Sequence, residues 1–173
     1  MNGLDIIELN KSHLNLIKNF ESSNVELFEF LVEDAYNNQI INISKTYLAF
    51  KDNILVGYIT LLNDSIHLEG DLKQVFKNKG VHYKSLPALK IGRLAVADDF
   101  QRKGIGSELI SFSIVISNKL NEYSACRFIV LDAKHNKISG KDPLHFYKKI
   151  GFKILKEREK GTIPMYLDLY RSD

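Results

Sequence analysis

The sequence has a single cysteine, no long hydrophobic run, and no acidic residue from Phe100 to Ser107. A lone thiol, Cys126, excludes an internal disulfide framework and any metal site built from several cysteines. The longest strongly apolar stretch, LISFSIVIS, is too short to cross a bilayer. The start of the sequence, MNGLDIIELNKSH, lacks the basic beginning and long apolar core of a signal peptide. We therefore expect a cytoplasmic protein with no membrane segment. The five histidines show no metal-ligand spacing, so we assign no metal.

Length and charge leave few broad classes open. The 173 residues are most simply one domain, 1–173, and the hydrophobic fraction of 45 % with 26 % charged residues is ordinary for a globular protein. The net charge of +3 permits an anionic partner without requiring one.

The order of hydrophobic patterns predicts a mixed α/β fold. Two β-branched and aromatic runs, 45–50 and 54–62, flank the turn sequence KDN and predict an antiparallel hairpin. In the second half we expect a strand over 88–96, an apolar-periodic helix over 104–120 and a buried strand over 126–133. Such a crossover makes its two strands parallel and right-handed.

The remaining segments should flank this core. We expect two helices within 12–37, a polar and irregular segment over 63–86 with a short helix near 71–79, and strands at 5–9, 152–157 and 163–169. A helix over 143–150 has clear punctuation: Asp142 suits the N-cap and Pro143 the first helical position. Gly151 suits the residue past the helix end.

The start of the helix over 104–120 is built in a way that weakens an empty helix. Arg102 and Lys103 stand where the helix dipole is positive, and Gly104 and Gly106 form helices poorly. A helix start has unpaired N–H groups, and glycines let an anion approach the backbone closely. The stretch therefore predicts a phosphate-binding site; the bland alternative is a tight turn marked by glycines.

The glycine spacing favours one kind of phosphate site. A nucleotide-hydrolase loop needs a Lys-Ser/Thr pair after its last glycine, and the dinucleotide fingerprint needs a small residue where Leu109 stands. Instead, Gln101-x-x-Gly104-x-Gly106 after a strand ending GRLAV resembles the acetyl-CoA signature of the GCN5-related N-acetyltransferases, the GNAT family. A second block, HFYKKIGF at 145–152, resembles that family's Phe-Tyr-x-x-x-Gly-Phe.

The resemblance implies a GNAT-like fold and an enzyme, an acyltransferase, that moves an acetyl group from acetyl-CoA to a primary amine by direct attack on the thioester. It implies that Tyr147 is the general acid toward the leaving thiolate, although a plain core role is the alternative. It further implies that the Val96 amide stabilises the oxyanion. The implied coenzyme-binding positions are Leu94, Ala95 and Val96 along the pantetheine arm, and Gln101, Arg102, Lys103, Gly104, Ile105, Gly106 and Ser107 at the diphosphate.

Two departures from the family pattern concern the acceptor. The strand ALKIGRLAV has Lys90 and Arg93 but no carboxylate to deprotonate an amine. The loop KHNKISGKD is longer than usual, so Asn136 is not assigned as a pantetheine ligand. A lysine-like amine, with a pKa of about 10.4, is mostly protonated at neutral pH, whereas an α-amine at about 7.7–8.0 is not. The site therefore suits an α-amine or another weakly basic amine.

Three further expectations stay open at this point. SLPALKIGRLAV and PMYLDL resemble the toxin-type branch of the family, which acetylates the α-amine of aminoacyl-tRNA and pairs with an antitoxin; late basic residues could meet its phosphates. These residues are Lys141, Lys148, Lys149, Lys153, Lys156, Arg158 and Lys160. The alternative of another class is a non-catalytic acetyl-CoA sensor. Finally, Ile110, Ile114 and Val115 predict a second buried face of the long helix, against another helix or in a homodimer.

Overall fold

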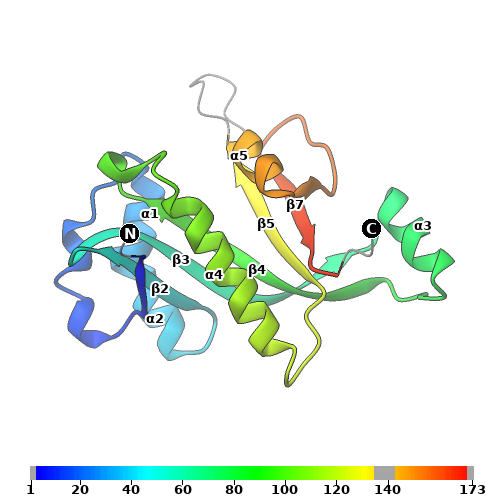
Figure 1. Ribbon diagram of the computed structural model, residues 1–173, viewed down its shortest axis with the longest axis horizontal. Helices are drawn as coiled ribbons and strands as arrows, with labels where there is room; N and C mark the ends of the chain where they lie inside the picture. The colour runs from blue at the N-terminus through cyan, green and yellow to red at the C-terminus, as the bar shows by residue number, and fades with distance from the viewer. Residues whose placement is uncertain (1–2, 135–142, 171–173) are drawn as a thin grey trace. The chain divides into compact units, whose positions relative to one another are not determined.

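The computed structural model describes residues 3–134 and 143–170, whose strands form a mixed seven-stranded sheet in the order β1-β2-β3-β4-β5-β7-β6 (Figure 1). This confirms the predicted α/β class. The strands are β1 (Asp5–Glu8), β2 (Lys45–Lys51), β3 (Ile54–His67), β4 (Ser85–Val96), β5 (Phe128–Lys134), β6 (Lys153–Ile154) and β7 (Thr162–Asp168).

The helices cover much the same segments that the hydrophobic patterns indicate. They are α1 (Val25–Glu29), the π-helix η3 (Phe30–Asp34), α2 (Ala35–Ile40), α3 (Gly70–Asn78), α4 (Ile105–Leu120) and α5 (Pro143–Ile150). Short 3₁₀ turns η1, η2 and η4 lie at Lys11–His13, Ile17–Asn19 and Asp98–Phe100. Within the described ranges, no helix is long and apolar enough to cross a membrane.

The chain divides into two compact units that share β3, β4 and α4 at their boundaries. Unit 1 comprises Met1–Leu62 and Ile91–Val115, and unit 2 comprises Asn63–Lys90 and Ile116–Asp173. The predicted diphosphate-binding sequence therefore belongs to unit 1, and the block with Tyr147 belongs to unit 2. Each unit is described by itself below.

In unit 1, β2 and β3 form the predicted hairpin. They pair antiparallel from Lys45 opposite Leu61 to Lys51 opposite Ile54. The two turn residues Asp52 and Asn53 have φ values of 50° and 64°. Positive φ at both central residues defines the turn that matches the right-handed strand twist, and Asp and Asn tolerate it well. This is why the KDN sequence predicted the hairpin correctly.

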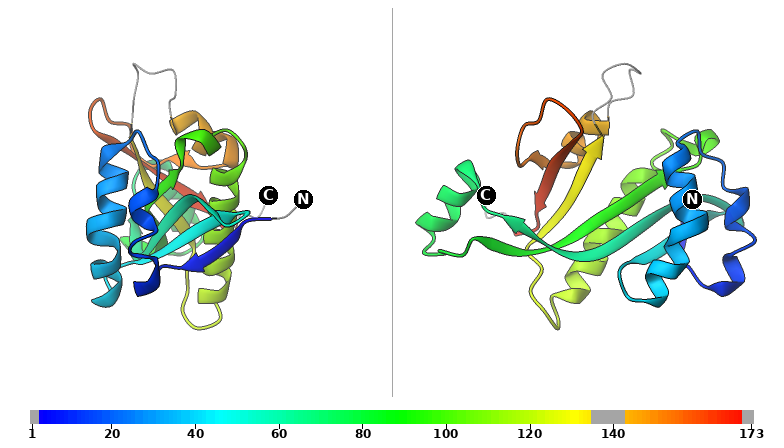
Figure 2. Two further views of the ribbon diagram at one scale, coloured as in Figure 1. Left: turned by 90° about the vertical axis from the view of Figure 1, so that its left-hand side faces the viewer. Right: turned by 180° about the vertical axis from the view of Figure 1, so that it is seen from behind.

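The sheet of unit 1 is covered on both faces (Figure 2). On one face Tyr58 is fully buried among Leu31 and Ala35 of the helical segment 25–40. On the other face β3 has Gly57, where an added Cβ would lie 2.8 Å from the Ala95 carbonyl oxygen and 3.3 Å from Leu109 Cδ1. Gly57 therefore lets the first turns of α4 lie directly on the sheet, next to the start of the predicted phosphate site.

The amino-terminal helical region differs from its prediction. Of the two helices expected within 12–37, the first is replaced by the short turns η1 and η2, which follow the capping residue Asn10. The second begins after Asn24, whose side chain accepts from the Leu27 amide, and runs to Ile40. Its middle, Phe30–Asp34, is π-helical. A π-turn is an insertion within an α-helix, so hydrophobic periodicity does not reveal it.

The second apolar face of α4 is partly covered within unit 1. Ile110 is 1 % exposed and Ile114 is half-buried. Val115 stays 50 % exposed. The chain itself therefore supplies most of the predicted contact, and a homodimer through Val115 stays a prediction.

In unit 2, the segment 63–86 is more regular than predicted. β3 continues through Asn63 to His67 despite its polar residues, and α3 packs Phe76 into a core with Phe128 and Ala88. The Phe76 and Phe128 rings meet edge-on with centroids 5.8 Å apart. The short helix expected near 71–79 is therefore confirmed by α3, whereas the irregular structure expected at 63–67 was wrong, because strand pairing overrides weak local propensity.

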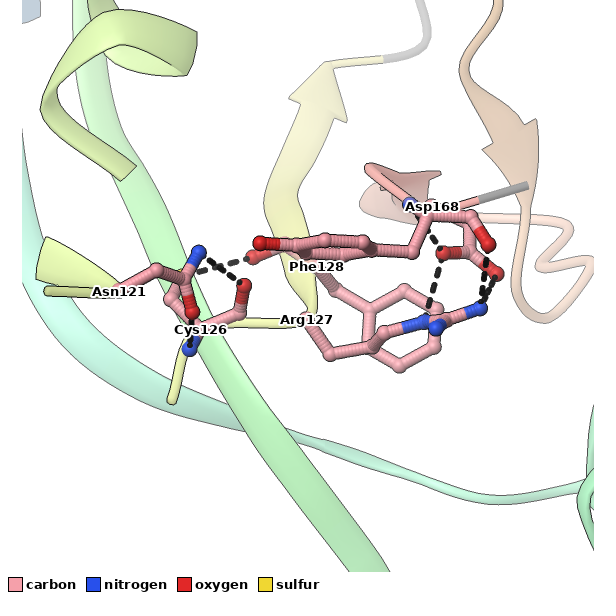
Figure 3. A network of polar contacts seen from close by, with 6 residues as sticks. Asn121, Cys126, Arg127, Phe128 and Asp168 are labelled. Carbon is pink, nitrogen blue, oxygen red and sulfur yellow. Dashed lines mark hydrogen bonds and ion pairs between the residues drawn. The ribbon is translucent and has the colours of Figure 1, made fainter. Parts of the chain in front are cut away.

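The start of β5 is fixed by a polar network (Figure 3). Asn121 accepts from the Cys126 amide at 2.7 Å and donates to its carbonyl at 3.0 Å. Arg127 Nη2 donates to Asp168 Oδ2 and to the Tyr170 carbonyl, both at 2.9 Å. Arg127 Nε lies 2.8 Å from Asp168 Oδ1 without hydrogen-bond geometry. These contacts join β5 to the end of β7, and Cys126 is buried as predicted.

Candidate functional site

The connection between β4 and α4 contains an unusual run of backbone angles. Gln101 is extended, Arg102 has φ 61° and Gly104 has φ 88°. Lys103 between them is not in the left-handed region. Alternation of left-handed and ordinary residues turns successive N–H groups into one concavity that binds anions. A left-handed arginine costs about 1 kcal/mol or more, so its presence points to a binding role.

The first turn of α4 presents unpaired donors beside this loop. The bond from the Glu108 amide to the Gly104 carbonyl, 3.1 Å, is the first of the helix. The amides of Ile105, Gly106 and Ser107 therefore precede the helical hydrogen bonds. Gly104 has no side chain to cap them, and an added Cβ there would meet nothing within 4 Å. Its glycine is required by the positive φ, and the space beside it is open.

Positive charge surrounds the same donors. Arg102 and Lys103 are exposed, and Lys103 Nζ lies 5.1 Å from the centroid of the Phe100 ring. Both cations and the helix dipole have the same sign, so the loop repels itself unless an anion binds. The arrangement can hold a phosphate or diphosphate.

Asp98 is a residue of this region that sequence reasoning missed. Its carboxylate accepts from Gln101 Nε2 at 2.9 Å, from the Ser23 amide at 2.7 Å and from Ser23 Oγ at 3.2 Å. It thereby ties the loop to the segment before α1. The sequence shows that Asp98 follows the strand by two residues, but not that its partner is Ser23, 75 residues away.

The three predicted strand residues lie at the end of β4. Ala95 is 4 % exposed and belongs to the unit 1 core, whereas Leu94 and Val96 are half-buried. Gln101 Nε2 also lies 3.4 Å from the Val96 carbonyl oxygen. The loop and the strand end are therefore brought together, as the sequence predicted.

Tyr147 lies on α5 in unit 2, near a fully satisfied helix end. Gly151, at φ 113°, donates to the Lys148 carbonyl, and the Phe152 amide donates to the Tyr147 carbonyl, both at 3.0 Å. This pair of bonds is the Schellman motif that the glycine predicted. The predicted N-cap, Asp142, lies outside the described residues, as do His135, Asn136 and Lys141.

The surroundings of the Tyr147 ring keep its hydroxyl protonated. The ring contacts Phe146 and Phe152 with centroids 5.1 and 5.7 Å apart. Burial raises the pKa of Tyr147 to about 12, because the phenolate would lose hydration. A phenol in this environment can donate a proton at any physiological pH, which suits a general acid and not a base.

Lys90 of β4 is engaged by carboxylates of neighbouring strands in unit 2. Its Nζ lies 2.8 Å from Asp132 and 3.7 Å from Asp64. Burial lowers the pKa of Lys90, but the hydrogen bond and charge of Asp132 with the charge of Asp64 outweigh it, so the pKa is raised overall. Lys90 stays protonated and cannot accept a proton. Among the described residues, no three His, Cys, Asp or Glu side chains gather as metal ligands do.

A comparison of the sequence with known protein families identifies the class of protein. A family profile described as the acetyltransferase (GNAT) domain matches residues 42–154. The chain therefore belongs to the GNAT family and is an acyltransferase. This confirms the resemblance seen in the two sequence blocks. No curated protein sequence matches the chain significantly.

Among solved structures, the chain is similar to toxins of this family. AtaT complexed with acetyl-methionyl-tRNAfMet is 19 % identical, with 96 % of this chain and 95 % of that chain covered and a TM-score of 0.77. A tyrosine-to-phenylalanine mutant of KacT is 20 % identical, covers 94 % of each chain and has a TM-score of 0.76. An AtaT mutant bound to the C-terminus of the antitoxin AtaR and acetyl-CoA is 18 % identical, with 96 % and 94 % covered and a TM-score of 0.73. At these identities the likeness shows the fold.

Proposed function

We propose that the chain acetylates the α-amine of aminoacyl-tRNA with acetyl-CoA as the acetyl donor. The observation that carries the acceptor assignment is the lack of a free base on β4. That strand has no carboxylate, and its Lys90 is held protonated by Asp132 and Asp64. Such a strand suits an acceptor whose amine arrives already deprotonated.

The pKa of the amine decides which acceptors qualify. At pH 7 an α-amine with a pKa near 7.8 has roughly several hundred times more free base than a lysine side chain with a pKa near 10.4. Esterification of the amino acid lowers the amine pKa further. Aminoacyl esters are therefore the acceptors that need least help from the protein.

In this proposal the coenzyme is held by the backbone of unit 1. The Gln101 amide donates to the Asp98 carbonyl at 3.3 Å, so the amides from Arg102 to Ser107 would bind the diphosphate, with Arg102 and Lys103 adding charge-assisted hydrogen bonds. The main chain of Leu94, Ala95 and Val96 would pair with the pantetheine arm as an added strand does. The left-handed turn at Arg102 and Gly104, whose cost is otherwise unexplained, supports this assignment.

The chemistry needs little more than positioning and two hydrogen bonds. The free amine attacks the thioester carbonyl, and the Val96 amide would stabilise the negative charge on oxygen. As the C–S bond breaks, Tyr147 would give its proton to the leaving thiolate. The raised pKa of Tyr147 supports a donor that is protonated when the substrate arrives.

The charge distribution is compatible with a tRNA partner. In the described part of unit 2, Lys148, Lys149, Lys153, Arg158 and Lys160 are all exposed. Lys156 is also exposed and lies 3.5 Å from Glu69, so its charge is partly offset. A tRNA acceptor is compatible with the cytoplasmic location expected from the sequence. The likeness to AtaT, whose solved complexes include a tRNA and an antitoxin, makes an antitoxin partner part of the same proposal.

An acceptor panel tests the proposal. Transfer of radiolabelled acetyl from acetyl-CoA is measured onto a pool of aminoacyl-tRNA, a lysine-containing peptide and free amino acids at pH 7. We expect turnover on aminoacyl-tRNA, at least about 100-fold above the peptide because of the free-base fractions. Faster peptide acetylation would overturn the acceptor assignment. Acetyl-CoA binding without turnover on any amine would favour a non-catalytic sensor instead.

A further inference from the structure

We propose that Arg93, stacked on Phe30, binds a phosphate of the acceptor nucleotide and so selects phosphate-bearing aminoacyl esters. The inference rests on the proposed function and names the residue that would recognise the acceptor in unit 1. In the sequence, Arg93 was singled out only as one of two cations on a strand that lacks a carboxylate.

The guanidinium of Arg93 is fixed and yet not neutralised. Its central carbon lies 4.9 Å from the centroid of the Phe30 ring, and Nη1 donates to the Gly92 carbonyl at 2.8 Å. The residue is exposed. In the described ranges no carboxylate forms an ion pair with it, although Glu29 and Glu33 are exposed on the same helix as Phe30. An ordered arginine without an internal anion is suited to an external one.

The partner ring is itself held by an unusual piece of helix. Phe30 is the first residue of the π-helical segment, and its ring stacks on Tyr58 with centroids 6.5 Å apart at 17°. Tyr58 is fully buried and donates to the Leu27 carbonyl at 2.6 Å. π-turns are rare and occur often at functional sites. Here the turn starts at the residue that supports Arg93.

The positive charge of Arg93 also acts on Tyr58, whose ring stacks on Phe30. Burial raises the pKa of Tyr58, and the positive charge of Arg93 acts against that rise. The guanidinium therefore provides a positive potential at the surface of the Phe30–Tyr58 pair, which a phosphate would meet first.

The position of Arg93 along β4 matches the size of an aminoacyl ester. It precedes Val96, the proposed oxyanion donor, by three residues, which is about 10 Å along a strand. In an aminoacyl ester the carboxyl group is consumed, so the nearest anion to the amine is a phosphate of the nucleotide. One ribose separates that phosphate from the ester, so its distance from the amine is comparable to the distance between Arg93 and Val96. The guanidinium can donate to two oxygens of the phosphate at once.

The test compares two acceptors that differ only in phosphate. Aminoacyl esters of adenosine carry none, whereas the same aminoacyl esters of adenosine 5′-monophosphate carry one beyond the ribose. For wild-type protein we expect kcat/KM to be at least about tenfold higher on the phosphate-bearing ester, mostly through KM, as charge-assisted hydrogen bonds would give. In Arg93→Gln the ratio should fall toward one, and in Arg93→Lys it should be intermediate.

Two further variants separate recognition from general effects. Phe30→Leu keeps the charge but removes the ring, and should lower the ratio part of the way. Lys51→Gln removes another exposed cation of unit 1 and should leave the ratio at the wild-type value. An unchanged ratio in Arg93→Gln overturns this inference while acetyl transfer itself persists. Loss of acetyl-CoA binding by the wild-type protein in calorimetry would instead defeat the proposed function.

Discussion

The start of α4 in unit 1 and the end of α5 in unit 2 are opposite in construction. At α4 the capping residue is Gly104, the preceding loop contains a left-handed arginine, and cations face the positive end of the helix. At α5, Gly151 completes a Schellman motif, and Lys148 and Lys149 stand at the negative end, where they are favourable. One helix end is locally satisfied and the other is not.

The difference shows how function can be separated from folding at helix termini. The residues at the end of α5 follow the ordinary rules for helix ends without any ligand. They therefore stabilise the helix that holds Tyr147. The α4 start breaks several rules together, and a bound anion would make its unpaired amides and its cations favourable. Mutations at the two ends should therefore have different readouts.

The largest effect is expected from Tyr147→Phe. Removal of the hydroxyl should lower kcat by about 100-fold, the lower end for general acids, because a thiolate is already a good leaving group. The coenzyme affinity should not change. Single-turnover kinetics and calorimetry measure the two quantities. Tyr123→Phe, at a residue 89 % exposed in the same unit, is the control and should retain the wild-type kcat. An unchanged kcat in Tyr147→Phe would leave the ring as plain core.

A smaller effect is expected from Gly104→Ala. A Cβ at φ 88° costs about 1–2 kcal/mol of stability and should weaken acetyl-CoA binding about tenfold, as the loop shifts to relieve the strain. Gly80 offers a matched control, since it has φ 77° and equally open space around its Cβ. Gly80→Ala should lose similar stability without any change in coenzyme affinity. Equal affinity losses in both variants would contradict the assignment of the α4 start.

The corresponding change at the other helix end should affect stability alone. Gly151→Ala places a Cβ at φ 113° and should reduce the free energy of unfolding by about 1–2 kcal/mol. For a chain of this length Tm should fall by about 2–4 °C per kcal/mol. Thermal unfolding with and without acetyl-CoA measures it. A selective loss of the coenzyme-induced rise in Tm would show that this end also contacts the ligand.

The smallest effect is expected from alkaline pH, which should leave the proposed general acid Tyr147 protonated. Burial raises the pKa of Tyr147 to about 12, so the proton required for catalysis is lost only as the pH rises through that value. An unshifted phenol, with a pKa of about 10, would be half ionised at pH 10. We expect kcat to vary less than about twofold between pH 8 and pH 10. A decline centred near pH 10 would mean that the hydroxyl is solvated in the working enzyme.

Features governed by local chemistry were predictable from the sequence. Asp52 and Asn53 tolerate positive φ, so they located the hairpin, and Gly151 marked the end of α5 for the same reason. The glycines and cations before α4 violated local rules, and that violation located the loop that we propose binds the diphosphate. Each of these signals lies within a few residues of the structure that it specifies.

Features that depend on distant partners were not predictable. The strand residues 63–67 are polar, but pairing within the sheet makes them regular. The ion pairs of Lys90 join β3, β4 and β5, and the hydrogen bonds of Asp98 to Ser23 connect residues that are 75 positions apart in the sequence. The π-turn at Phe30 has no signature in the amino-acid composition of its helix. Neither the turn nor the contact of Phe30 with Arg93 could therefore be predicted.

The burial of Cys126 has a practical consequence for enzymology. It is the one cysteine of the chain, it is 2 % exposed, and its sulfur accepts from Ser117 Oγ at 3.2 Å. Each acetyl transfer releases one coenzyme thiol into solution. A chromogenic thiol reagent should therefore report turnover continuously in the native protein, with negligible background from the enzyme and no cysteine replacement beforehand.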